Sequence, residues 1–153
     1  MKSVLSVLIS LLLLGSACSS GADQSASTSN EPVMIPDDAS ATERIDLWIE
    51  ANDYESALAW LEGQDSQDPS IQLLFEKTWL NYGLHNMITF DAQNMRTQMN
   101  NALRCFAEVL EINPQNQVAR DQISQILGVY RTMPDRSPEP DVVERLATFG
   151  FNP

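Results

Sequence analysis

The sequence predicts an all-α fold of consecutive antiparallel helical hairpins. From residue 41 onward, apolar residues recur three or four positions apart, as in Met95, Met99, Ala102 and Phe106, and this is the spacing of one face of an α-helix. The same region has no sustained alternation of apolar and polar residues that would indicate a strand. Turn and capping signals such as Asn113 separate the apolar stretches, so each helix is expected to be followed by a reversal of the chain.

Length and charge exclude several classes of protein. The 153 residues suffice for one modest domain, and nine Lys plus Arg against 21 Asp plus Glu give a formal net charge of −12. A chain this acidic repels phosphate groups, so no nucleic-acid partner is expected. The only cysteines are Cys18 and Cys105, and no Cys/His cluster has metal-ligand spacing. Neither a disulfide scaffold nor a metal site is therefore predicted.

Residues 1–17 are predicted to be an export signal. Lys2 precedes an apolar run over residues 4–14, and small residues follow that run. A helix of this length extends about 17 Å, which is too short for the roughly 30 Å of a membrane's hydrocarbon core. A permanent transmembrane span is therefore not expected.

The sequence LGSAC at residues 14–18 resembles the lipobox of bacterial lipoproteins. The resemblance implies that the signal is cleaved before Cys18 and that this cysteine carries the acyl chains that hold the protein on the membrane. Ser19 after the cysteine is compatible with the outer membrane of a Gram-negative host. The alternative is an ordinary secretory signal, cleaved near Ala17 or Ala22, that leaves a soluble periplasmic protein.

Residues 18–40 are predicted to be a disordered tether that follows the lipidated cysteine. The segment is rich in Ser, Ala, Asp and turn-forming residues, a composition that buries too little apolar surface to fold alone. The apolar residues 33–35 are either part of this linker or a short strand or turn that packs on the first helix.

Five apolar stripes predict five helices within residues 41–133. Each stripe has its apolar residues on one helical face, and the intervening segments carry caps, turns or helix-stopping residues. The stripes are Ile45, Trp48 and Ile49; Ala57, Trp60 and Leu61; Phe75, Trp79 and Tyr82; Met95, Met99, Ala102, Phe106 and Leu110; and Val118, Ile123, Ile126, Leu127 and Tyr130.

One spacing occurs twice in this region. In both copies a small alanine is followed four residues later by a large apolar residue and twelve residues later by proline. The alanine lets a neighbouring helix approach closely, the larger side chain fills the space one turn later, and proline does not continue the preceding helix. The two sets are Ala57, Leu61 and Pro69, and Ala102, Phe106 and Pro114.

This spacing resembles the second half of a tetratricopeptide (TPR) repeat, whose A-x₃-F and P pattern lies within a period of 34 residues. The two alanines are 45 residues apart. We place the excess between Tyr82 and Ala102, where it would lengthen two helices and their connection. The resemblance implies that residues 41–133 form a short TPR-like α-hairpin solenoid of about two and a half repeats.

Residues 134–153 are predicted to contain a C-terminal capping helix. Ser137 is expected to be its N-cap and Pro138 its first residue, and the helix is expected to end near Gly150. Phe149 and Phe151 would then cover the exposed end of the stack or lie in its groove; the alternative is an autoinhibitory or partner-docking tail. The apolar face of this helix would comprise Val142, Val143 and Leu146.

No catalytic residue, cofactor or metal ligand is predicted. His85 is the only histidine, so a Ser/His/Asp set depends on it alone, and it is expected to have a structural or solvent-facing role at a helix end. Cys105 lies within an amphipathic helix, where a buried, inert thiol is expected. No glycine-rich phosphate-binding loop is present.

The TPR resemblance implies a groove, lined by the first helix of each repeat, that binds a peptide or protein partner. The candidate positions are acidic or apolar, which favours a basic or amphipathic partner. In the expected register, the partner-binding candidates are Thr42, Asp46, Glu76, Leu80, Asp121 and Gln125.

The expected function is a membrane-anchored protein-interaction scaffold in the bacterial cell envelope, not an enzyme. In a Gram-negative host it would be attached to the outer membrane through Cys18 and face the periplasm. The alternatives are a dedicated subunit of one larger envelope complex, or a soluble periplasmic adaptor if Cys18 is not lipidated.

Overall fold

The computed structural model describes residues 33–89, 91–133 and 135–152, and within them it contains six α-helices and no strand. The predicted all-α fold is confirmed for this part of the chain. The predicted signal peptide, Cys18 and most of the predicted tether lie outside the described residues. The helices are α1 (Ala41–Glu50), α2 (Tyr54–Glu62), α3 (Pro69–Ile88), α4 (Met95–Ile112), α5 (Gln117–Arg131) and α6 (Pro140–Thr148).

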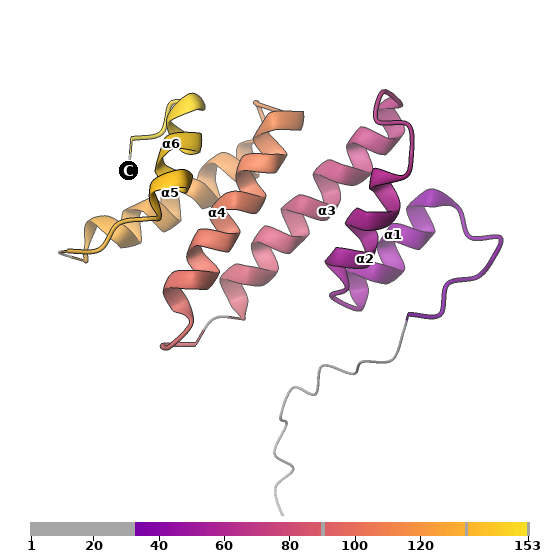
Figure 1. Cartoon of the computed structure of the whole chain (residues 1–153), viewed down its shortest axis with the longest axis horizontal. Coiled ribbons are helices and arrows are strands. Elements are labelled where there is room, and N and C mark those ends of the chain that lie inside the picture. Colours follow the sequence, from indigo (N-terminus) through magenta and orange to yellow (C-terminus); the bar gives the residue numbers. More distant parts are fainter. Residues whose placement is uncertain (1–32, 90, 134, 153) are drawn as a thin grey trace, which may run out of the picture. The chain divides into compact units, whose positions relative to one another are not determined.

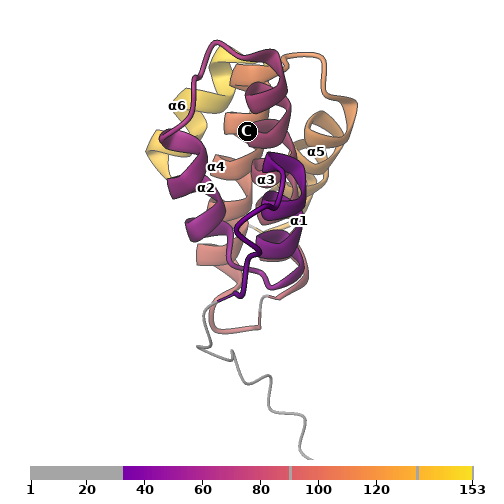
Figure 2. The same ribbon diagram turned by 90° about the vertical axis from the view of Figure 1, so that its right-hand side faces the viewer.

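Neighbouring helices pack antiparallel in two layers (Figure 1). Figure 2 shows α1, α3 and α5 on one side and α2, α4 and α6 on the other. The contact between α3 and α4 is the most extensive, and α3 also contacts α1 and α2. α6 packs on α4, so the last helix belongs to the same layer as α2 and α4.

Short polar residues begin four of the six helices. Each accepts a hydrogen bond from a backbone N–H of the first turn, which would otherwise have no partner within the helix. Ser40 forms a capping box with Glu43, in which each side chain bonds to the backbone of the other residue. The four capping side chains are Ser40, Asp53, Asp68 and Asn116.

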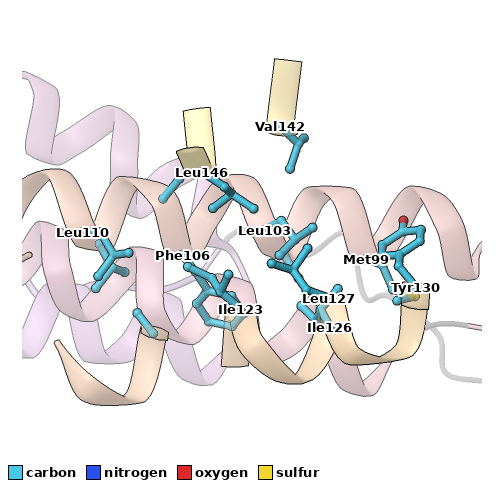
Figure 3. Close-up of a cluster of buried hydrophobic side chains, with 14 residues drawn as sticks. Met99, Leu103, Phe106, Leu110, Ile123, Ile126, Leu127, Tyr130, Val142 and Leu146 are labelled. Carbon is cyan, nitrogen blue, oxygen red and sulfur yellow. The ribbon is translucent and has the colours of Figure 1, made fainter. Parts of the chain in front are cut away.

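Two hydrophobic clusters hold the helices together. The smaller cluster joins α1, α2 and α3 around Ile45, Ala57 and Leu61. The larger cluster joins α3, α4, α5 and α6, and Figure 3 shows its labelled side chains in a row that extends from Leu110 past Phe106 to Met99 and Tyr130. Because α3 contributes residues to both clusters, it is the element that connects the two halves of the core.

α3 and α4 approach each other closely at Gly83. A Cβ atom at this position would lie 2.5 Å from Cε1 of the fully buried Phe106 ring, so no larger residue fits without movement. Ala102, one turn before Phe106, is also fully buried, as expected for the small residue of the repeated spacing. The extra length predicted between Tyr82 and Ala102 is present as helix, since α3 and α4 have 20 and 18 residues.

The predicted start of the C-terminal helix is wrong. α6 begins at Pro140 with Glu139 as its N-cap, rather than at Pro138 with Ser137 as its N-cap. The reason is local: Pro140 disfavours the helical conformation for the residue before it, and Glu139 is accordingly extended (φ −65°, ψ 148°), so the helix starts at the second proline. The backbone N–H of Glu139 also donates a 2.8 Å hydrogen bond to Oδ1 of the buried Asn100 on α4.

The predicted apolar faces are partly wrong in both α5 and α6, because Val143 of α6 is only half-buried and lies outside the larger cluster. Val142 and Leu146 are buried in the larger cluster. Val118 is 48% exposed, and the neighbouring Ala119 is buried in its place, one helical turn before Ile123.

The C-terminal aromatic residues pack on the stack as the capping interpretation predicts. Phe149 and Phe151 are half-buried against the larger cluster. The Arg120 guanidinium lies 5.0 Å from the centre of the Phe151 ring and donates a hydrogen bond to the carbonyl oxygen of Phe149. Residues 33–35 form no strand; Met34 is 89% exposed, whereas Val33 and Ile35 are half-buried.

We predict that Gly83→Ala destabilises the fold. The added methyl group would meet the Phe106 ring, and overpacking costs about 1–3 kcal/mol, which exceeds the gain of about 1 kcal/mol from alanine's helix propensity. Gly128→Ala in α5 is the matched control, because a Cβ there meets nothing within 4 Å. Urea unfolding should show a lower free energy of unfolding for Gly83→Ala only; equal stability of the two variants would contradict the close contact.

Candidate functional site

A cleft of about 460 Å³ opens between α2 and α4, with α3 as its floor. Its walls belong to α2, the loop after it and α4, whereas the predicted partner-binding residues lie on α1, α3 and α5. Apolar and acidic side chains share its surface. The lining residues are Glu62, Ser66, Gln72, Phe75, Trp79, Glu108, Glu111 and Ile112.

The floor of the cleft continues into a row of aromatic rings. Phe75 and Trp79 are one turn apart on α3 and are half-buried. The ring of Trp79 is stacked with that of Tyr82 at 6.3 Å, and Tyr82 is stacked with Tyr54 of α2 at 4.7 Å. Burial raises the pKa of both tyrosine hydroxyl groups. Phe75 and Trp79 thus give the cleft an apolar floor, and the two tyrosines extend the row of rings beyond it.

Acidic side chains form both walls. Glu62 is the last residue of α2, and Glu108 and Glu111 lie one turn apart near the end of α4. In the described part of the chain, no Lys, Arg or His lies within 4.0 Å of the Glu62 carboxylate. Placing carboxylates on both sides of an apolar floor makes the cleft complementary to a ligand that is both cationic and apolar.

Arg145 of α6 lies at the edge of the α4 wall. Its Nη1 is 2.6 Å from Oε1 of Glu108, and its Nη2 is 3.8 Å from Oε1 of Glu111. The hydrogen bond to Glu108 raises the pKa of the guanidinium above its already high value. Glu108 is thus neutralised from outside the cleft, whereas Glu111, whose side chain is 55% exposed, has only the longer contact.

Three of the predicted partner-binding residues have partners within the fold. Asp46 on α1 pairs with Lys77 on α3. Oε1 of Glu76 accepts hydrogen bonds from the side-chain amides of Asn113 and Asn116, at 2.8 and 2.7 Å. Leu80 is half-buried against the larger cluster.

The other predicted positions are exposed. Asp121 accepts a 2.7 Å hydrogen bond from Gln117, one turn earlier on α5. Gln125 follows it one turn later on the same helix, and Thr42 lies in the first turn of α1. The role of these three residues in binding stays a prediction. Asp46 and Glu76, by contrast, connect helices to one another within the fold.

His85 and Cys105 are held by packing. The His85 ring is 5.4 Å from the Tyr54 ring, in the last turn of α3. Cys105 is a buried free thiol, and desolvation raises its pKa from 9.0 to about 12. Neither residue lines the cleft.

Two further kinds of feature can be assessed within the described ranges. No group of three His, Cys, Asp or Glu side chains is placed to hold a metal ion among residues 33–89, 91–133 and 135–152. None of the helices in these ranges combines the length and hydropathy needed to cross a bilayer.

A comparison with protein-family models, curated proteins and solved structures found no match.

Sequence reasoning missed the cleft, although it named some of its residues. The apolar periodicity predicts Phe75 and Trp79 as packing residues of one stripe, and it carries no information about the acidic residues around them. The cleft depends on the gap between α2 and α4, and 32 residues separate these two helices along the chain. One feature of the sequence points to the cleft. α3 carries apolar residues on several of its faces, and the two helices next to it in the chain cannot cover all of them.

We predict that the Cys105 thiol resists alkylation in the folded protein. With a pKa of about 12, the thiolate fraction at pH 8 is about 1 in 10⁴, and the thiolate is the reactive form. Iodoacetamide labelling followed by mass spectrometry of the peptide containing Cys105 should show modification only after denaturation in urea. Rapid labelling of the native protein would contradict the burial of this side chain.

Proposed function

We propose that this protein is a lipid-anchored interaction module of the bacterial cell envelope. The lipobox-like sequence at residues 14–18 supports export and acylation at Cys18. Because each buried CH₂ contributes about 0.8 kcal/mol, several acyl chains would hold even a strongly acidic chain on a membrane. In a Gram-negative host, the folded region would face the periplasm from the outer membrane.

We further propose that the helical region is a short TPR-like stack. Four residues of the repeated spacing have matching environments in its two copies: Ala57 and Ala102 are fully buried in the second helix of their hairpins, as are Leu61 and Phe106 one turn later. The prolines differ, since Pro69 is the first residue of α3 and Pro114 lies in the turn before α5. The shared positions of the alanines and of the large apolar residues support the resemblance.

The single observation that carries a binding role is the open cleft between α2 and α4. It leaves aromatic rings partly accessible between carboxylates, and a partner could bury them while pairing with the charges. The two residues with the most reactive side chains, His85 and Cys105, are outside this cleft. We therefore propose that the protein acts by association rather than by catalysis.

A second candidate function is that of a dedicated subunit in one envelope complex. Ile88, at the end of α3, is 81% exposed, and Leu73 on the same helix is 65% exposed. In this alternative, the long α3–α4 hairpin and the C-terminal tail would be permanent interfaces. Stoichiometric co-purification with one complex would favour it, whereas exchangeable, substoichiometric partners would favour the scaffold.

We predict that Cys18→Ala releases the protein from the membrane and abolishes incorporation of labelled palmitate. Wild type and variant would be expressed in a Gram-negative bacterium, fractionated, and analysed by intact-mass spectrometry for acyl chains. Cys105→Ala is the matched control and should remain labelled, because that thiol is buried. Unlabelled, freely released wild-type protein would contradict the anchor and favour the soluble adaptor.

A further inference from the structure

We propose that the cleft between α2 and α4 binds a segment of a partner protein in which arginine side chains flank a large apolar side chain. This inference rests on the proposed binding function and specifies the ligand. It also assigns binding to the layer of α2 and α4, not to the surface that carries Asp121 and Gln125.

Carboxylates lie on both sides of the cleft. Glu62 is on one wall, and Glu108 and Glu111 are on the other. In the described chain, Arg145 is 2.6 Å from Glu108 and 3.8 Å from Glu111, whose side chain is 55% exposed. Glu62, and Glu111 through its exposed side, are thus available on opposite walls to cationic groups that enter from solvent.

The aromatic floor of the cleft contains Trp79. An arginine over an indole ring gains a cation–π interaction, and tryptophan is the best such partner. The chain uses this contact elsewhere: the Arg44 guanidinium lies 5.9 Å from the Trp48 ring and 5.6 Å from the Trp60 ring. Trp79 in the cleft is half-buried and has no such cation among the residues that the structure describes.

The cleft favours arginine over lysine. The guanidinium group is planar, so it can stack on Trp79 while its edge donates hydrogen bonds to a carboxylate. Arg145 already forms such a charged hydrogen bond with Glu108 at the outer edge of the wall. An ammonium group is more strongly hydrated and cannot stack in this way.

Size and net charge restrict the source of the ligand. A volume of about 460 Å³ accommodates a few side chains, which fits a short segment better than a broad surface. A second copy of this chain is disfavoured as the occupant, because each copy has a formal net charge of −12 and would bring like charges together. The favoured occupant is a basic, amphipathic segment of another protein.

The proposal is tested with a fluorescently labelled, amphipathic peptide that has arginines on one face and leucines on the other. Binding to the full-length protein would be followed by fluorescence anisotropy in nanodiscs of neutral phosphatidylcholine, so that the lipid does not attract the peptide. If the protein proves not to be lipidated, the same titration is done without nanodiscs. The ligand and the anchor are therefore tested separately.

We expect Glu62→Gln and Glu111→Gln each to raise Kd about twofold to fivefold, as for partly exposed ion pairs. Trp79→Leu should raise Kd roughly threefold to tenfold by removing the cation–π contact. Replacing the arginines of the peptide with lysines should weaken binding, and replacing them with glutamates should abolish it. The charge-matched control is Glu144→Gln, an exposed position on α6 outside the cleft, which should leave Kd unchanged.

Several results would overturn the proposal. Equal weakening by Glu62→Gln and Glu144→Gln would indicate non-specific attraction to an acidic protein. Weakening by Asp121→Asn but not by Glu62→Gln would place the peptide on the layer of α1, α3 and α5. A dimer in analytical ultracentrifugation that the peptide dissociates would identify a second copy as the natural occupant. Because Glu62 is exposed, its variant is informative even if Trp79→Leu fails to fold.

Discussion

Phe106 packs directly over the backbone of Gly83, and this contact brings α3 and α4 closer together than any larger residue at position 83 would allow. The Phe106 ring is also part of the cluster that contains residues of α5 and α6. Because α3 contributes to the second cluster with α1 and α2 as well, one close helix pair connects both halves of the core. A shift of α3 relative to α4 would therefore be transmitted to every other helix.

Polar contacts place the segments that the apolar core leaves undetermined. Asn100, fully buried on α4, bonds to the backbone of Glu139 and to the Tyr130 hydroxyl group, which joins α4 to α5 and to the start of α6. Arg104 pairs with Glu139 and Asp141 near the same point. These contacts set the position of α6, and α6 in turn places Arg145 at the edge of the cleft beside Glu108.

The cleft follows from how the helices are distributed between the two layers. α3 lies between α2 and α4, and the latter two do not close over its outer face, so Phe75 and Trp79 stay partly accessible between acidic walls. Part of the negative charge of the chain is therefore located at this cleft, on Glu62, Glu108 and Glu111. A covalent lipid anchor and an acidic cleft are compatible, because the anchor supplies the membrane attachment that negative charge cannot.

The sequence alone determined the helical class and most buried positions, such as Ala57, Ala102 and Leu146, because apolar periodicity acts within one or two turns. It also contained the reason why Ser137 is not the N-cap of α6, since Pro140 disfavours a helical conformation at Glu139. What only the tertiary structure decided there is the hydrogen bond from Glu139 to the distant Asn100. The cleft was likewise decided only by the tertiary structure: its walls come from α2 and α4, and no local pattern encodes the distance between two helices that do not follow one another in the chain.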